Sequence, residues 1–286
     1  SFRTLKTEYR SMESLYHALR NRVRTETSIA THWPQVDQRW KNVGNLLKAW
    51  WQRLTSGLSY ETLTFLQFLD DAEQRLSQPA VPPDMQSDDL VRMGHINGEH
   101  DQFCHDLQQI SEWFQAAKTD QFKISALYED SNRRLADITA KTKDRTLLLN
   151  VYQLRAKMLT IISKAKGVFQ RWKLPIALRE GLNHEWDAAK IQLETYTTDF
   201  AKLNLEFRAA LDGCTASEAM NRAEAERLGR EITEQWDDVQ TNMRSLYEML
   251  DTLFKNFRFY TESYEKVYAW LQEAEMASTA SETQKL

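Results

Sequence analysis

The sequence predicts an all-α protein in which tandem three-helix bundles are joined by continuous helices into an elongated rod. Three observations lead to this prediction. Apolar residues recur every 3 or 4 positions over long stretches, as they do in helices that pack side by side. Eight Gly and five Pro among 286 residues leave few turns. The apolar stretches also return at a spacing of about 97 residues, which indicates a repeat array.

The longest apolar stripe lies near the C-terminal end and contains no Gly or Pro. Its members are separated by alternating steps of 4 and 3 residues: Ile232, Trp236, Val239, Met243, Leu246, Leu250, Leu253, Phe257, Tyr260, Tyr264, Val267 and Leu271. A helix of about 40 residues is roughly 60 Å long, which exceeds the core of a compact domain. The stripe therefore predicts one helix that is shared by two successive bundles.

Two earlier stretches repeat this stripe. Residues 36–54 match its first half at an offset of 196, and residues 65–76 match its second half at an offset of 195. A middle copy covers residues 147–172 and follows a weaker, more polar and basic stretch. The three copies predict three junction helices, each of which ends one bundle and starts the next.

Single helices with stripes of their own lie between the junction helices, near residues 5–23, 93–114 and 182–207. Proline in residues 78–84 and at Pro175 predicts breaks. Another break is predicted at Gly213 and Ser217, as a helix-ending glycine and an N-cap serine. Short connections require each single helix to run antiparallel to its neighbours. The predicted units are a partial two-helix repeat at 1–58, complete repeats at 59–150 and 151–256, and a further helix start with a disordered tail at 257–286.

A repeat of this length, with three helices, a continuous junction helix and an aromatic residue at a fixed position, resembles the spectrin-repeat family. The strings Asp37-Gln38-Arg39-Trp40 and Gln235-Trp236-Asp237-Asp238 are similar to the tryptophan region of the family's third helix. The middle unit departs from the pattern, because Arg133-Arg134-Leu135 stands there. The off-consensus aromatics look most like the divergent repeats of nesprins, dystrophin-related proteins and plakins. The resemblance covers nearly the whole chain.

This resemblance implies a non-catalytic scaffolding segment of a large cytoskeletal linker, which spaces and docks partners and bears force between the cytoskeleton and a membrane. The implied location is cytoplasmic and cytoskeleton-associated, including the cytoplasmic side of the nuclear envelope. The implied partners are cytoskeletal proteins including actin, motors or actin-regulating proteins, and an anionic membrane surface; the piece itself is expected to be monomeric. The alternative is a membrane-remodelling dimer of the BAR type that binds anionic lipid. Such modules also have long heptad helices, but they lack a repeat near 97 residues.

Charge is distributed unevenly along the chain. Residues 133–173 hold eleven Lys or Arg against two Asp, a net charge of +9, and residues 61–120 have a net charge of −9. Either the two stretches balance one another inside the protein, or the basic helix docks an acidic partner. The candidate partner-binding residues are Arg133, Arg134, Lys141, Lys143, Arg145, Arg155, Lys157, Lys164 and Lys166, with a second candidate face at Lys48 and Trp51.

The tryptophans divide into two groups. Five lie on the apolar stripes and are expected in the cores: Trp40, Trp50, Trp172, Trp186 and Trp236. The others, including Trp51 and Trp270, lie beside a stripe, where an aromatic side chain can serve as a binding hot spot.

Other functions find little support in the sequence. No catalytic arrangement, phosphate-binding loop or cofactor motif is expected. His100 and Cys104 stand one helical turn apart, but a zinc site needs about four ligands, so the expected roles are a hydrogen-bonded histidine and a small core residue. The net charge of −4 argues against a general nucleic-acid binder. No apolar run is long enough for a transmembrane helix, and the chain, which starts without Met, is expected to be an excised piece.

Overall fold

The computed structural model describes residues 2–23, 32–85, 89–116, 126–173 and 182–283. In these ranges the chain forms seven α-helices and no strand, which confirms the all-α class. The helices are α1 (Phe2–Arg22), α3 (Trp33–Leu54), α4 (Tyr60–Ser77), α5 (Leu90–Ala116), α7 (Ala126–Lys173), α8 (Leu182–Ala216) and α9 (Arg222–Thr283). The chain divides into two compact units: Ser1–Asp71 with Phe114–Arg133, and Ala72–Trp113 with Arg134–Leu286.

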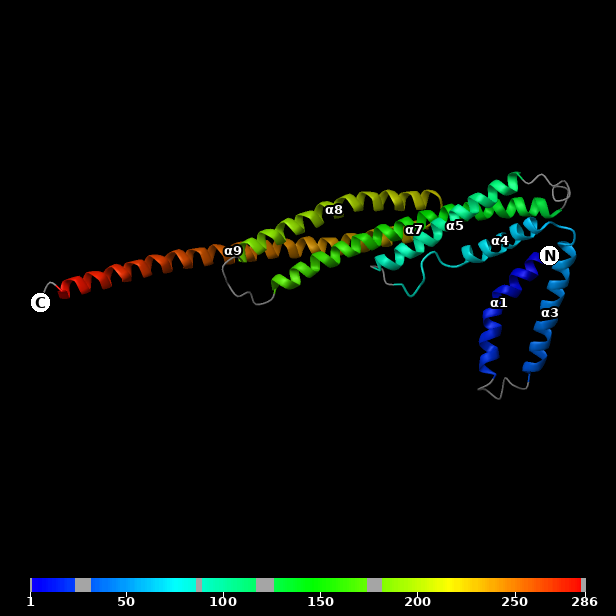
Figure 1. Ribbon diagram of the computed structural model, residues 1–286, viewed down its shortest axis with the longest axis horizontal. Coiled ribbons are helices and arrows are strands. Elements are labelled where there is room, and N and C mark those ends of the chain that lie inside the picture. Colours follow the sequence, from blue (N-terminus) through cyan, green and yellow to red (C-terminus); the bar gives the residue numbers. More distant parts are fainter. Residues whose placement is uncertain (1, 24–31, 86–88, 117–125, 174–181, 284–286) are drawn as a thin grey trace. The chain divides into compact units, whose positions relative to one another are not determined.

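A hydrophobic core in the second unit is shared by α7, α8 and α9. Helix α8 runs back alongside the second half of α7, and α9 returns beside both (Figure 1). The buried residues of each helix follow its apolar stripe: Val151, Leu154 and Met158 in α7, Trp186, Leu193 and Phe200 in α8, and Ile232, Val239 and Leu250 in α9. Three amphipathic helices thus remove their apolar faces from water together.

Two of the three predicted junction helices are continuous. Helix α7 has 48 residues and α9 has 62. The described part of α7 ends at Lys173, and the predicted break at Pro175 lies outside the described residues. Helix α9 continues past Met276 to Thr283, over much of the tail that the sequence predicts to be disordered; residues 284–286 lie outside the described ranges.

The first predicted junction helix is interrupted, so the expected continuity there is wrong. Helix α3 ends at Leu54, and Gly57 adopts a left-handed backbone with φ of 87°, a conformation that glycine adopts without steric cost. The next helix starts after Ser59, whose hydroxyl accepts the Thr62 N–H at 3.2 Å as an N-cap. The change of offset from 196 to 195 residues falls at this break.

The break between α8 and α9 lies beyond its predicted position. Gly213 is inside α8, which continues to Ala216, and Glu218 adopts a φ of 61° in the turn. Asn221 caps α9, because its side-chain oxygen accepts the Glu224 N–H at 2.8 Å. An asparagine one turn further along therefore provides the cap that the sequence assigned to Ser217.

Stacked aromatic rings hold the helices of the first unit together. Trp40 of α3 lies between two tyrosines of α1, with ring centroids 4.0 Å from Tyr9 and 4.6 Å from Tyr16. In the same unit Phe114 stacks on Phe65 at 4.7 Å and on Tyr128 at 5.0 Å. Such aromatic pairs contribute about 0.5–1.5 kcal/mol each beyond the area they bury.

Candidate functional site

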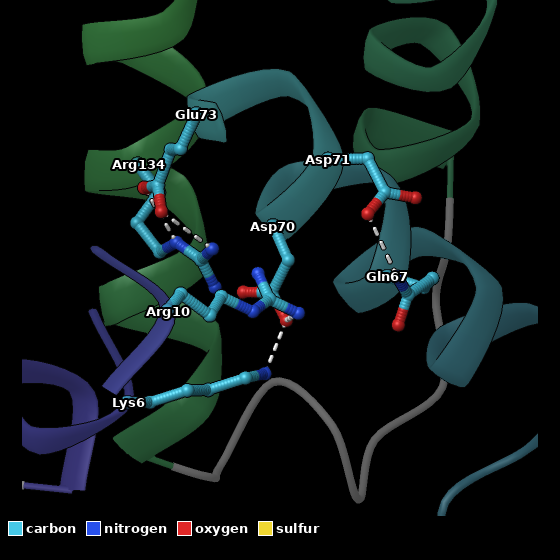
Figure 2. Close-up of polar contacts among 7 residues, drawn as sticks. All are labelled: Lys6, Arg10, Gln67, Asp70, Asp71, Glu73 and Arg134. Carbon is cyan, nitrogen blue, oxygen red and sulfur yellow. Dashed lines mark hydrogen bonds and ion pairs between the residues drawn. The ribbon is translucent and has the colours of Figure 1, made fainter. Parts of the chain in front are cut away.

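The basic stretch on α7 contains both internal ion pairs and solvent-facing cations. Arg134 belongs to the first kind: it is buried, and its guanidinium donates from Nε and Nη2 to the two carboxylate oxygens of Glu73 on α4, each at 2.9 Å. Figure 2 shows this two-pronged contact. Arg134 lies in the basic stretch and Glu73 in the acidic one, so this pair supports charge balance inside the protein.

Arg145 donates hydrogen bonds to backbone carbonyl groups at and just beyond the C-terminal end of α4. Its Nη1 donates to the carbonyl oxygens of Arg75 at 2.9 Å and Gln78 at 3.2 Å, and its Nη2 donates to Pro79 at 3.0 Å. The last carbonyls of a helix have no partner within the helix, and a cation there also complements the helix dipole. The Arg145 guanidinium is thus used in hydrogen bonds inside the protein.

Arg155 is the third basic residue that is engaged internally. Its guanidinium lies 2.5 Å from Glu231 on α9, and Arg227 of the same helix contacts Glu231 at 3.6 Å. The Arg155 side chain is only 12% exposed. A partner that approaches from solvent would therefore meet little of this cation.

The other cations of the stretch face solvent. Arg133, Lys141, Lys143, Lys164 and Lys166 are exposed, and Lys157 is half-buried. Lys141 pairs with Asp137 one helical turn away at 2.8 Å, a contact that is worth only a few tenths of a kcal/mol between exposed groups. These residues are the part of the predicted site that a partner can reach.

Three of these lysines form a row along α7. Lys143, Lys157 and Lys164 are separated by 14 and 7 residues, and positions at multiples of seven fall on nearly the same side of a helix. The row, which we call the lysine row, spans about 32 Å at 1.5 Å per residue. Sequence reasoning listed its members without their common face, although the spacing of seven would have shown it.

The second candidate face, at Lys48 and Trp51, also contains one residue that faces solvent and one that is partly covered. Lys48 is exposed. Trp51 is half-buried, and the ammonium group of Lys6 from α1 lies 4.2 Å from the centre of its ring, a cation–π contact. The indole face of Trp51 is thus partly covered by α1.

Sequence reasoning missed a buried carboxylate in the first unit. Asp70 on α4 is buried and receives Lys6 and Arg10 of α1, with Arg10 at 3.6 Å. Both cations point toward Asp70 in Figure 2. No spacing pattern pointed to this contact, because Asp70 lies 60 or more residues from its partners.

His100 and Cys104 lie in a polar contact between α5 and α7. The Thr146 hydroxyl donates to the carbonyl of Thr142 at 2.9 Å, so its oxygen accepts from His100 Nε2, also at 2.9 Å. The Cys104 sulfur lies 3.6 Å from the same nitrogen. Among the described residues no group of three or more His, Cys, Asp or Glu is placed to hold a metal ion.

The environment of His100 favours the neutral ring. Burial lowers the pKa of His100, and the nearby cations Arg145 and Arg75 lower it further, against a smaller opposing effect of Asp101. A histidine whose pKa is lower in the folded state binds more protons when unfolded. The neutral His100 ring therefore stabilises the fold in full above about pH 6.5, the ordinary pKa of histidine. This stability is lost as the pH falls from there toward the pKa of His100 in the folded state.

We expect His100→Gln to flatten the pH dependence of stability below about pH 6.5. The glutamine amide can still donate to Thr146 but does not titrate in this range. The measurement is chemical denaturation between pH 5 and pH 8, with His105→Gln as the matched control, since His105 is exposed on the same helix. An equal change of slope in both variants would contradict the assignment to His100.

Comparison with known proteins gives one informative match. No family model and no solved structure matches the chain. The chain is similar to the Muscle-specific protein 300 kDa of Drosophila melanogaster, with 20% identity over 263 residues. The match covers 89% of this chain and 2% of the relative. The chain is therefore an all-helical protein similar to a small part of a much larger muscle protein.

None of the helices in the described ranges has a stretch that is both long and apolar enough to cross a membrane. Their apolar residues are arranged in stripes, and this arrangement suits contact with other helices.

Proposed function

We propose that this chain is a non-catalytic scaffolding segment of a large cytoskeletal protein, built from spectrin-like three-helix units. The observation that carries the proposal is the course of α9, which is buried in a three-helix core at Leu250 and continues without a break to Thr283. A helix that leaves one core with its apolar stripe intact is suited to enter another. Such sharing produces a chain of units that spaces its partners and bears force.

The similarity to a muscle-specific protein supports a role in force-bearing tissue. The segment would act in the cytoplasm, between the cytoskeleton and a membrane, and for a nesprin-like parent that membrane is the nuclear envelope. The small share of the relative that is matched is consistent with one piece of a long array of units.

The docking surface that we propose for this segment is the lysine row. Lys143 and Lys164 are exposed, and within the described residues neither has an ion-pair partner. Cations at intervals along about 32 Å of helix complement an acidic, extended partner, and filamentous actin is the partner of this kind that we propose.

The test is co-sedimentation with filamentous actin at low and physiological salt. We expect the double variant Lys143→Glu with Lys164→Glu to bind roughly tenfold more weakly, because like charges then face the filament. The matched control reverses two exposed lysines outside the row, Lys202→Glu with Lys255→Glu, and is expected to bind as the unmodified chain does.

Equal binding of both double variants would contradict the docking surface. Binding to vesicles that contain anionic lipid, without binding to filaments, would favour the membrane alternative instead. Circular dichroism of each variant shows whether the helices are retained, so that loss of binding is not mistaken for loss of fold.

A further inference from the structure

A groove runs along the surface of the second unit between the end of α8 and the start of α9. It has a volume of about 1240 Å³, and it is lined from Asn204 to Ala216 on α8 and from Asn221 to Thr233 on α9. At 1.5 Å per residue it follows the two helices for about 18 Å. Both helices already share their core with α7, so the groove, which we call the α8–α9 groove, belongs to a core of three helices.

A glycine in the interior of α9 leaves the α8–α9 groove open. Gly229 lines the groove, and a methyl group added at its α-carbon would meet the Leu211 side chain at 3.8 Å, an ordinary contact. The packing of α8 against α9 therefore does not require glycine here, although glycine is less favourable than alanine inside a helix. Ala225, one turn earlier, also lines the groove. The two small residues leave room for a side chain of another molecule.

Charged side chains give the two ends of the groove opposite signs. Arg208 of α8 and Arg230 of α9 are exposed on opposite walls, and no ion pair within the described residues involves either of them. Three carboxylates line the part nearer the turn between the helices: Asp212, Glu218 and Glu226. The last of these is already paired with Arg222 at 3.0 Å. A ligand with an acidic group at one end and a basic group at the other complements this arrangement.

The shape of the groove favours a helical ligand over an extended peptide or a small molecule. The backbone groups along α8 and α9 are used in hydrogen bonds within each helix, so the groove has no free strand edge for an extended peptide to pair with. A helical ligand satisfies its own backbone, and a helix that lies against two others is the usual geometry of helical bundles. The groove is also larger than small-molecule sites, which are roughly 300–1,000 Å³.

We propose that the α8–α9 groove binds an amphipathic helix of a partner protein, which lies on the three-helix core as a fourth helix. Acidic side chains of the partner reach Arg208 and Arg230, and a large apolar side chain fills the space over Gly229. Basic side chains of the partner meet Asp212 and Glu218 at the other end. About three turns of helix match the length of the groove. The site does not include the lysine row of α7, so it is independent of the proposed binding to actin.

The test measures the binding of a synthetic helical peptide to the full chain. The probe is a stapled, fluorescently labelled peptide of about 14 residues, with leucines on one face, two glutamates beside that face near one end and two lysines near the other. We expect saturable binding at physiological salt, measured by fluorescence anisotropy. The same peptide with glutamine in place of its glutamates and lysines should bind roughly tenfold more weakly.

A double variant tests the cationic end of the groove. Arg208→Glu with Arg230→Glu should bind the peptide roughly tenfold more weakly, because like charges then face each other. The matched control is Lys202→Glu with Arg244→Glu, at exposed positions of the same two helices outside the groove, and it should bind as the unmodified chain does. Circular dichroism checks that both variants keep their helices.

Gly229→Met separates a seat in the groove from attraction between charges. The methionine side chain occupies the groove without changing the net charge, so binding should fall roughly tenfold. Thermal stability should be kept or raised, since methionine is the better helix former. Gly229→Ala adds only a methyl group that fits beside Leu211 and should bind within about twofold of the unmodified chain.

Three results would overturn the proposal. The first is the absence of saturable binding to the unmodified chain at up to about 1 mM peptide. The second is equal binding by the arginine double variant and its control. The third is unchanged binding by a folded Gly229→Met variant, which would place the peptide elsewhere on the surface.

Discussion

Replacing Trp186 with alanine should destabilise the second unit by about 3–5 kcal/mol, the range observed when a large aromatic is removed from a core. Trp186 is among the most completely buried side chains of the chain. The centre of its ring lies 5.1 Å from the ring centre of Trp172 on α7 and 5.5 Å from that of Tyr247 on α9, and both contacts are edge-on. The substitution therefore removes contacts with both neighbouring helices and leaves a cavity. Chemical denaturation followed by circular dichroism measures the loss.

Two further variants make this measurement specific. The indole N–H of Trp186 is buried without a hydrogen-bond partner among the described residues, so Trp186→Phe removes an unsatisfied donor while keeping an aromatic ring. We expect it to cost much less than the alanine variant. Trp270 on α9 is exposed, and Trp270→Ala in dilute solution should change stability by less than about 0.5 kcal/mol. A small effect of Trp186→Ala would contradict the three-helix core.

Replacing Arg134 with alanine should destabilise the protein by about 1–3 kcal/mol. Removing one member of a fully buried ion pair costs roughly 3–5 kcal/mol, and the expectation here is lower because the Glu73 side chain is 25% exposed and can recover part of its hydration. Arg134 donates two hydrogen bonds to that carboxylate, and both are lost. Thermal and chemical denaturation give the change in stability.

Arg133 provides the matched control for this prediction, since it is the adjacent residue, has the same side chain and is exposed. Arg133→Ala should leave stability within about 0.5 kcal/mol of the unmodified chain. A comparable loss in the two variants would mean that the effect comes from the net charge of the stretch. A loss confined to Arg134→Ala assigns it to the contact with Glu73.

The sequence predicted the helices well because heptad stripes report directly on which face of a helix is buried. Trp172, Trp186 and Trp236 are buried as their stripe positions indicated. Trp50 also lies on a stripe, yet it is exposed, because a stripe gives the face that can be buried and not the number of helices present to bury it. The break at Gly57 was missed for a related reason: the stripe continues on both sides of a turn that glycine permits.

The candidate site was harder to predict than the fold. Counting charges treated Arg134, Arg145 and Lys164 alike, although the first pairs with Glu73, the second caps α4 and the third is exposed. The first two roles depend on residues between 61 and 70 positions away, and pairing across such distances leaves no local pattern. Only the spacing of the lysine row could have been read from the chain itself.

The interruption between α3 and α4 has a consequence for how the protein opens. Where one helix serves two cores, melting one core disturbs the turns that serve the other, and the two tend to open cooperatively. At residues 55–59 no such helical coupling exists. The pair α1–α3 can therefore open without unwinding α4, and the contacts that this opening removes include those of Lys6 and Arg10 with Asp70. Amide hydrogen exchange would record this as faster opening of α1 and α3.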